Sequence, residues 1–216
     1  MKLVIFDLDG TLLDTLQDIA NSCNYALNKH GFPIHPKSAY KRFVGNGIHT
    51  LIERALPVAD RTDDIVEKVK ADFVAYYDMH GQDSTQPYPG IMNMLRHLKE
   101  MGLLISVASN KYHEAVVPLV QHYFPDILFN LVLGHRTGRP AKPNPDIIFD
   151  TLHTLGIAPQ NCCYVGDSDV DMITAKQADI KAIGVAWGFR NEAELIKHGA
   201  NNIIQAPSHL FDIVLD

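Results

Sequence analysis

Cysteine is scarce in this chain, which has three cysteines among 216 residues. Two of them, Cys162 and Cys163, are adjacent, and an odd number with this spacing excludes a framework of disulfide bonds. We therefore expect the protein to reside in a reducing cytoplasm. Strand-like residues begin at Leu3, so we also expect no signal peptide before them.

Positive charge and long apolar runs are lacking as well. The formal net charge is −6 at pH 7, which gives no electrostatic reason to bind nucleic acid or an anionic membrane. No apolar run is long enough to cross a bilayer as a helix. With 46% hydrophobic and 20% charged residues, the composition is typical of a globular protein. The length allows one full core and a smaller second domain.

The order of helix-like and strand-like segments predicts a helical insertion near the start of the chain. Residues 3–6 form a short apolar run typical of a buried strand, and no other strand-like run occurs between residues 12 and 87. The apolar spacing instead predicts helices over about 16–30, 37–43, 47–57 and 63–79. We therefore expect a small helical domain at residues 15–86, inserted into a core of residues 1–14 and 87–216.

After the insertion, helices and strands alternate to the end of the chain. Apolar runs separated by helical stripes predict strands at 103–108, 128–133, 162–165 and 181–186. Repeated strand–helix units imply a parallel sheet with right-handed crossovers and helices on both faces. The sequence thus predicts an α/β protein, with a doubly wound parallel sheet (Rossmann-like) and an inserted helical cap.

The end of the first predicted strand carries two carboxylates. Residues 3–6 run directly into Asp7-Leu8-Asp9-Gly10-Thr11. Ligands and catalytic groups of open parallel sheets gather at the carboxyl ends of the strands. Two acids at such a place are costly unless a cation or a reaction needs them. This segment therefore predicts the position of an active site.

Three further strand ends carry candidate groups, each with an ordinary alternative. Ser109 and Asn110 could bind a phosphoryl oxygen, although this pair is also common in turns and helix caps. Lys142, stiffened by the following proline, could neutralise an anion, although a lone lysine is usually only solvated. Asp167 and Asp171 resemble a site for a hard cation, whereas capping by the intervening Ser168 and Asp169 explains only one acid.

Taken together and in this order, the four segments resemble the motifs of the haloacid dehalogenase-like hydrolase superfamily. The matching residues are Asp7, Asp9, Thr11, Ser109, Lys142, Asp167 and Asp171. The likeness covers nearly the whole chain, because the helical insertion lies where that family's type-one cap lies. The cap segment at 43–56 and Tyr88-Pro89-Gly90 look like the phosphoglycolate phosphatases of that superfamily. Asp179 stands where the family often has glycine.

The resemblance implies hydrolysis of a small phosphorylated metabolite through an aspartyl-phosphate intermediate. Asp7 would be the nucleophile and Asp9 the general acid and base, with Thr11 fixing the Asp9 side chain. Asp9 distinguishes the chain from dehalogenases, and Thr11 favours phosphatases over phosphoglucomutases. Ser109 and Lys142 would stabilise the phosphoryl group.

A Mg²⁺ ion is the cofactor that the resemblance implies. Its expected ligands are Asp7, the backbone carbonyl of Asp9 and Asp167, while Asp171 would orient Lys142 or a metal-bound water. Asn110 would add a donor to the phosphoryl group. In the cap, Arg42 and Arg54, with Lys41, are candidates to bind an acidic leaving group, although the Arg54 side chain could equally be exposed to solvent without binding it.

Other functions stay open on the sequence alone. A pyrophosphatase, a sugar-phosphate phosphatase or a phosphomutase would use the same motifs. A receiver-type signalling module also combines a phosphorylated aspartate, Mg²⁺ and a lysine, but it would be shorter and would lack the insertion. We expect the protein to be a monomer or a homodimer. The adjacent Cys162 and Cys163 should face opposite sides of their strand as small apolar residues.

Overall fold

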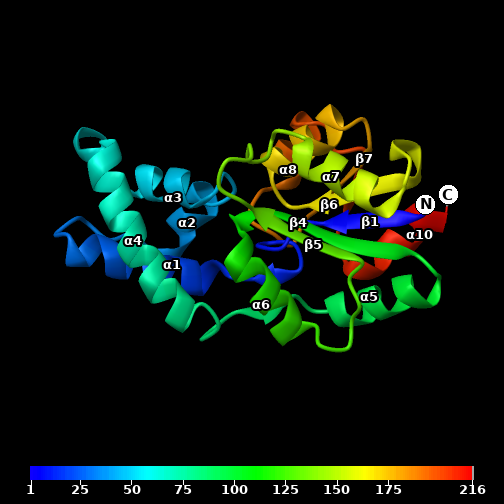
Figure 1. Cartoon of the computed structure of the whole chain (residues 1–216), viewed down its shortest axis with the longest axis horizontal. Coiled ribbons are helices and arrows are strands. Elements are labelled where there is room, and N and C mark those ends of the chain that lie inside the picture. Colours follow the sequence, from blue (N-terminus) through cyan, green and yellow to red (C-terminus); the bar gives the residue numbers. More distant parts are fainter. Residues whose placement is uncertain (216) are drawn as a thin grey trace.

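A parallel six-stranded sheet forms the centre of the molecule in the computed structural model, which describes residues 1–215 (Figure 1). Its strand order is β5-β4-β1-β6-β7-β8, and all neighbouring pairs are parallel. The strands are β1 (Leu3–Phe6), β4 (Leu104–Tyr112), β5 (Leu131–His135), β6 (Cys162–Gly166), β7 (Lys181–Val185) and β8 (Asn202–Ile204). The predicted fold class is therefore confirmed.

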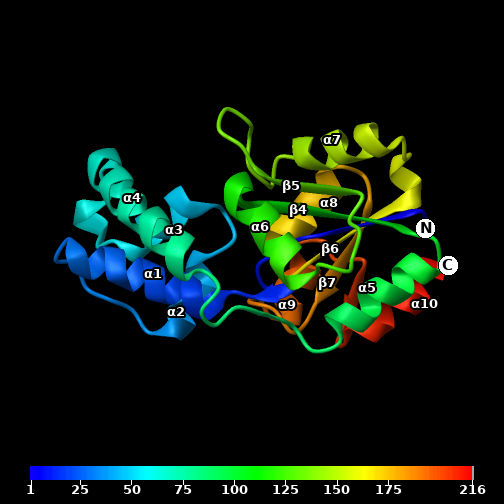
Figure 2. The same ribbon diagram turned by 60° about the horizontal axis from the view of Figure 1, so that its bottom comes forward.

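Helices cover both faces of this sheet. One face packs against α5 (Ile91–Glu100), α6 (His113–Tyr123) and α10 (Leu210–Leu215), and the other against α7 (Asp146–Leu155), α8 (Asp169–Gln177) and α9 (Glu192–Lys197). Figure 2 shows α5 and α10 on the side of the sheet opposite α7 and α8. Short 3₁₀ turns occur at Val58–Asp60, Pro159–Asn161 and Pro207–His209.

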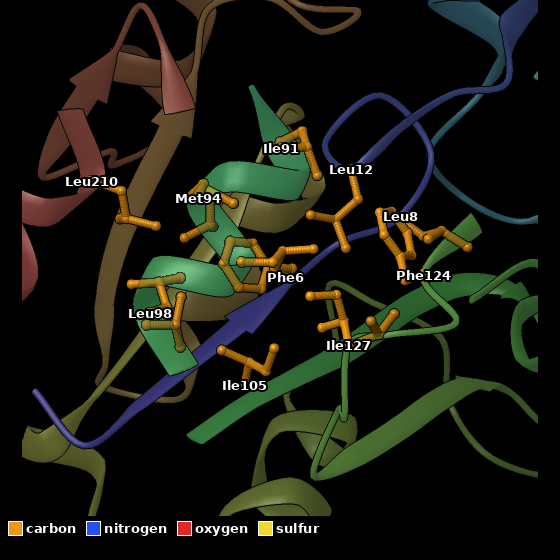
Figure 3. Close-up of a cluster of buried hydrophobic side chains, with 14 of the residues drawn as sticks. Phe6, Leu8, Leu12, Ile91, Met94, Leu98, Ile105, Phe124, Ile127 and Leu210 are labelled. Carbon is orange, nitrogen blue, oxygen red and sulfur yellow. The ribbon is translucent and has the colours of Figure 1, made fainter. Parts of the chain in front are cut away.

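Successive side chains of the buried strands point to opposite faces of the sheet. Phe6 lies in the cluster beneath α5 and α10, which Figure 3 shows, whereas Ile5 lies in the cluster beneath α7 and α8. The same alternation places Cys163 in the first cluster and Cys162 in the second, as predicted. Both thiols are buried and free.

Four helices form a separate group at one end of the sheet, which we call the cap (Figure 1). They are α1 (Leu16–Lys29), α2 (Lys37–Phe43), α3 (Ile48–Ala55) and α4 (Asp63–His80). Their apolar faces make a core of their own that includes Leu27, Ile52 and Val69. The predicted helices of this region are thus present, while the cap limits at residues 15 and 86 stay a prediction.

A pair of two-residue strands joins the cap to the sheet. β2 (Leu13–Asp14) pairs with β3 (Gln86–Pro87) in antiparallel fashion. The prediction of no strand between residues 12 and 87 was wrong for these residues, because two residues are too few to produce a periodic pattern. Beside this pair, the buried Asp18 carboxylate accepts hydrogen bonds from the backbone N–H groups of Ser84 and Thr85. The two chain segments that enter the cap are therefore tied together.

Strand β4 is longer than predicted and contains an irregularity at its end. The sequence pattern ended the strand at Ala108, but the structure continues it to Tyr112. Ala108 pairs with Leu133 and Tyr112 with His135, so β4 advances four residues while β5 advances two. Such a bulge re-aims side chains that a regular strand would alternate between its two faces. All three residues between Ala108 and Tyr112 are consequently buried at the same end of the sheet.

The backbone of Asp179 and the lengths of the helices complete the description of the fold. Asp179, beyond the end of α8, has a φ of 54°, in the left-handed region that favours glycine. Within residues 1–215, no helix is both long enough and apolar enough to cross a membrane.

Candidate active site

The carboxyl ends of three adjacent strands bring the predicted motif residues together. β1 lies between β4 and β6, so Asp7, Ser109 and Asp167 follow one another along one edge of the sheet. All three are buried. Lys142, from the loop between β5 and α7, reaches the same edge and donates a hydrogen bond to the carbonyl of Ala108 at 3.2 Å. The strand order thus assembles groups from four distant parts of the chain.

Asp7 is a buried carboxyl group with an unsatisfied oxygen. Its Oδ1 atom lies 3.1 Å from Lys142 Nζ, but it has no hydrogen-bond partner of suitable direction. Burial raises the pKa of Asp7 to about 7; Lys142 opposes this effect, and the neighbouring Asp171 and Asp9 add to it. A carboxylate in this position therefore needs a further cation or an electrophile beside it.

Lys142 supplies the fixed positive charge of the site. Its Nζ atom lies 2.7 Å from Asp171 Oδ1 and contacts the hydroxyl of Tyr164. Burial disfavours the charged ammonium, but Asp171 and Asp7 outweigh this effect and hold the pKa of Lys142 above its usual range. The expected contact between Asp171 and Lys142 is thus present, and the lysine stays protonated.

Thr11 binds a different acid from the one predicted. We expected its hydroxyl to fix Asp9, but Thr11 Oγ1 donates to Asp167 Oδ1 at 3.1 Å. The tight turn after β1 causes this difference, because Gly10 has a φ of 88° and lets the turn approach Asp167 closely. A Cβ atom at position 10 would lie only 2.4 Å from Asp167 Oδ2. The turn therefore carries Thr11 toward β6 rather than back to Asp9.

The start of α8 holds Asp171 in place. Ser168 caps this helix, and its side chain and backbone N–H both donate to Asp171 Oδ2. Because Asp171 Oδ1 contacts Lys142, both of its oxygens already have partners. Asp171 therefore acts chiefly as the group that orients Lys142. The neighbouring Asp169 pairs with Arg190, at 3.4 Å.

The acids at this edge fit a divalent cation. Carboxylate oxygens of Asp7, Asp167 and Asp171 lie within 4.8 Å of one another. Burial, and then the charges of Asp171 and Asp7, raise the pKa of Asp167 well above its usual range. Crowded buried carboxyls of this kind, one with an unpartnered oxygen, suit a hard cation such as Mg²⁺. Asp7 and Asp167 line the pocket between the sheet and the cap, whereas Asp171 does not, so these two acids are the best placed to bind it.

The carboxylate of Asp9 stands apart from this group. Both of its oxygens lie 3.2 Å from Lys111 Nζ. Lys111 is itself buried, and its ammonium lies 4.3 Å from the ring centroid of Tyr77 in α4. Sequence reasoning missed Lys111, because the predicted strand ended at Ala108, whereas the structure continues β4 through a bulge to Tyr112. The sequence feature that could have indicated Lys111 is its position directly after the Ser109-Asn110 pair.

A pocket between the sheet edge and the cap contains these groups. Its sheet side is formed by Asp7, Asp9, Ser109, Asn110, Lys111 and Asp167. Its cap side is mostly apolar, with Ile19, Val44, Ile48, Leu51, Phe73 and Tyr77. A small phosphorylated molecule placed here would meet the acids at one end and the cap at the other.

Comparisons with known proteins agree with this geometry. The family model for haloacid dehalogenase-like hydrolases matches residues 4–185. The chain belongs to that family. It is 33% identical, over 99% of its length and 96% of the relative's, to a phosphoglycolate phosphatase of Chromobacterium violaceum. It is 34% identical to a phosphoglycolate phosphatase of Mannheimia succiniciproducens, over 87% of each chain.

A solved structure supports the same assignment. The chain resembles a candidate phosphoglycolate phosphatase from Lactobacillus delbrueckii with a TM-score of 0.92 and 34% identity. That likeness covers 99% of this chain and 98% of the other. It therefore includes the cap as well as the sheet of this haloacid dehalogenase-like hydrolase.

The two cap arginines that were predicted to bind the leaving group lie outside the pocket of this hydrolase. Arg42 is exposed. Arg54 donates to the backbone carbonyls of Arg42 and Phe43, and to Asn46 Oδ1 at 2.9 Å. Neither side chain lines the pocket. Arg54 instead fixes the loop between α2 and α3, because its donors are taken up by that loop.

Two side chains of the sheet domain hold the same cap loop over the site. Asn110 Nδ2 donates to the carbonyls of Gly45 and Lys142, both at 2.9 Å, so its side-chain amide joins the cap to the sheet. Arg190 donates to the carbonyls of Lys41 and Val44. Sequence reasoning did not identify Arg190, because nothing in the local pattern links it to a loop almost 150 positions earlier.

Proposed function

We propose that this protein is a Mg²⁺-dependent phosphatase that cleaves a small phosphate monoester through an aspartyl-phosphate on Asp7. The observation that carries the proposal is the buried Asp7 carboxylate, whose Oδ1 atom lies 3.1 Å from Lys142 Nζ but accepts no hydrogen bond of suitable geometry. The Asp7 side chain lines a pocket that also contains a second acid, Asp9. An unsatisfied carboxylate oxygen is costly in the interior, so its retention fits a nucleophile.

The first half of the proposed reaction transfers the phosphoryl group to Asp7. A carboxylate oxygen of Asp7 attacks phosphorus in line as the bond to the ester oxygen breaks. Asp9 donates a proton to the departing alkoxide, which leaves as an alcohol. Lys142 and Ser109 offset the negative charge of the phosphoryl oxygens during this transfer.

The second half returns Asp7 to its initial state. Asp9, now deprotonated, accepts a proton from a water molecule as that water attacks phosphorus. The bond between phosphorus and the Asp7 oxygen breaks, and inorganic phosphate is released. A Mg²⁺ ion held by Asp7 and Asp167 would supply positive charge beside the phosphoryl oxygens.

Phosphoglycolate is the substrate that we propose. Relatives that carry this name cover nearly the whole chain, including the cap. The apolar cap wall and the loop held by Asn110 and Arg190 leave room for a small leaving group and exclude water from it. Pyrophosphate and sugar phosphates stay alternative substrates for the same chemistry.

A phosphate-release assay tests this function. Phosphoglycolate, pyrophosphate, sugar phosphates and nucleoside monophosphates are compared with and without Mg²⁺. We expect Mg²⁺-dependent release that is fastest with phosphoglycolate. Asp7→Asn should reduce kcat by about 1,000-fold or more without lowering Tm, since only the nucleophile is lost. Asp179→Asn, at an exposed position away from the pocket, is the control with unchanged activity. Turnover by Asp7→Asn near the rate of the unmodified protein would refute the assignment.

A further inference from the structure

Lys111 is a buried cation that the proposed chemistry leaves without a role. Its ammonium contacts both oxygens of Asp9 at 3.2 Å. Burial disfavours its charge, but Asp9 and then Tyr77 outweigh this effect and raise the pKa of Lys111 above its usual range. Burying a charged lysine is costly, and a simple surface ion pair would not require it. The position of this buried ammonium beside the pocket is therefore suited to binding a second anion, in addition to Asp9.

Tyr77 brings an unused donor to the same place from the cap. Its hydroxyl is buried and has no hydrogen-bond partner within the described residues. Burial raises the pKa of Tyr77 to about 12, so the hydroxyl keeps its proton and can donate. Both Tyr77 and Lys111 line the pocket, and the lysine ammonium lies over the tyrosine ring. A sheet residue and a cap residue thus place a cation and an unpartnered hydroxyl donor in the same part of the pocket.

The rest of the pocket offers no other site for a negatively charged leaving group. Among the residues that the structure describes, Lys111 is the only cationic side chain that lines it. The cap wall otherwise consists of apolar groups, such as Ile48, Leu51 and Phe73. Lys142 also carries a charge, but Asp7, Asp171 and the Ala108 carbonyl surround its ammonium.

We propose that Lys111 and Tyr77 bind a carboxylate on the leaving group of the substrate. The proposal rests on the phosphatase function above, in which Asp9 contacts the ester oxygen. A carboxylate one methylene away from that oxygen lies beside Asp9, and so within reach of the lysine that Asp9 contacts. In the protein without substrate, Asp9 itself pairs with Lys111. The substrate carboxylate takes over this partner, and Asp9, which takes up a proton from solvent when the ion pair breaks, can then protonate the leaving oxygen.

A pair of matched phosphonates tests the proposal without turnover. Phosphonopropionate and propylphosphonate share the phosphonate and the chain length, and differ only in a terminal carboxylate or methyl group. Binding of each to the Mg²⁺-loaded full chain is measured by titration calorimetry. We expect the unmodified protein to bind phosphonopropionate about 30-fold more tightly, as one charge-assisted pair allows.

Two variants separate the contributions of the two residues. Lys111→Met keeps the apolar stem and removes the charge, so the preference for the carboxylate should fall to about 2-fold or less. Tyr77→Phe keeps the ring and removes the hydroxyl, so the preference should fall by about 5-fold. If Lys111→Met does not fold, the measurement on Tyr77→Phe alone still tests the proposal. Lys68→Met, on an exposed part of α4, is the matched control and should keep the full preference.

Three outcomes would overturn the proposal. If the unmodified protein binds both phosphonates equally, no group in the pocket binds the carboxylate selectively. The proposed phosphatase function would still stand. If Lys111→Met weakens both phosphonates by the same factor, Lys111 acts only by positioning Asp9. If neither phosphonate binds the unmodified protein, the proposed phosphate site fails together with this inference.

Discussion

At the scale of single residues, the neighbours of Asp7 and Asp9 give these two acids different properties. Asp7 lies among Lys142, Asp167 and Asp171, with one oxygen that accepts no hydrogen bond. Asp9 faces away from this cluster and contacts Lys111 with both oxygens. The first arrangement suits an attacking carboxylate, and the second suits a group that changes partners during a reaction. Unequal surroundings are the usual means by which paired carboxyls acquire separate roles.

The raised pKa values of Asp7 and Asp167 predict how Mg²⁺ stabilises the protein. Between about pH 4 and pH 7, the metal-free native state holds a proton on Asp7 that the unfolded chain has lost, and Asp167, whose pKa is also raised, adds to this effect. Its free energy of unfolding should therefore decrease as the pH rises through this interval. Mg²⁺ binds the deprotonated acids and replaces those protons, so its stabilising effect should grow with pH. Thermal unfolding at about pH 5.5 and about pH 8 measures both effects.

Matched variants make this test specific to the site. Asp167→Asn should lose most of the Mg²⁺-dependent rise in Tm at the higher pH. Asp169→Asn should retain it, because that carboxylate pairs with Arg190 instead. An equal Mg²⁺ effect at both pH values would show that these carboxyls do not hold the ion.

At the scale of elements, the bulge in β4 determines which side chains face the pocket. A regular strand would direct Asn110 away from Ser109 and Lys111, yet all three line the pocket. The two extra residues of β4 relative to β5 make this possible. The loop between α2 and α3 lies opposite and is held by Asn110 and Arg190. A strand irregularity and a tethered loop thus form the two walls of the site.

Arg190 should contribute to keeping the cap loop closed. Arg190→Met removes its hydrogen bonds to the carbonyls of Lys41 and Val44. We expect kcat/KM for phosphoglycolate to fall about 3- to 10-fold, because the closed arrangement becomes less populated. The loop should also become more susceptible to limited proteolysis. Arg96→Met, an exposed substitution on α5, serves as the control. Unchanged kinetics together with unchanged proteolysis in Arg190→Met would contradict this role.

At the scale of the whole molecule, most of the fold follows from patterns along the chain. Apolar runs and helical stripes predicted the parallel sheet, because a doubly wound core requires buried strands separated by helices. Asp7, Ser109 and Asp167 were found because each follows directly after such a strand. The partner of Thr11, the contact of Lys111 with Asp9 and the contact of Arg190 with the cap were not found. These depend on a turn, a bulge and a long-range contact, none of which leaves a periodic signal.

The molecule joins its two parts by contacts at both sides of the pocket. Asp18 ties the two connecting segments together, and Tyr112 of β4 donates to Asp78 of α4. The cap loop contacts Asn110 and Arg190 on the other side. This arrangement places the cap over the pocket that Asp7 and Asp9 line. In the proposed reaction, such a covered pocket would favour transfer of the phosphoryl group to Asp7 before water attacks it.

The measurement that tests the central claim most directly is chemical trapping of the acyl phosphate. The full chain is quenched during turnover of phosphoglycolate with Mg²⁺, reduced with borohydride and mapped by peptide mass spectrometry. Borohydride converts an aspartyl-phosphate to homoserine with release of phosphate. We predict homoserine at position 7 and at no other aspartate. Homoserine at Asp167 or Asp171, or its absence in a chain that releases phosphate, would contradict the assignment of Asp7 as the nucleophile.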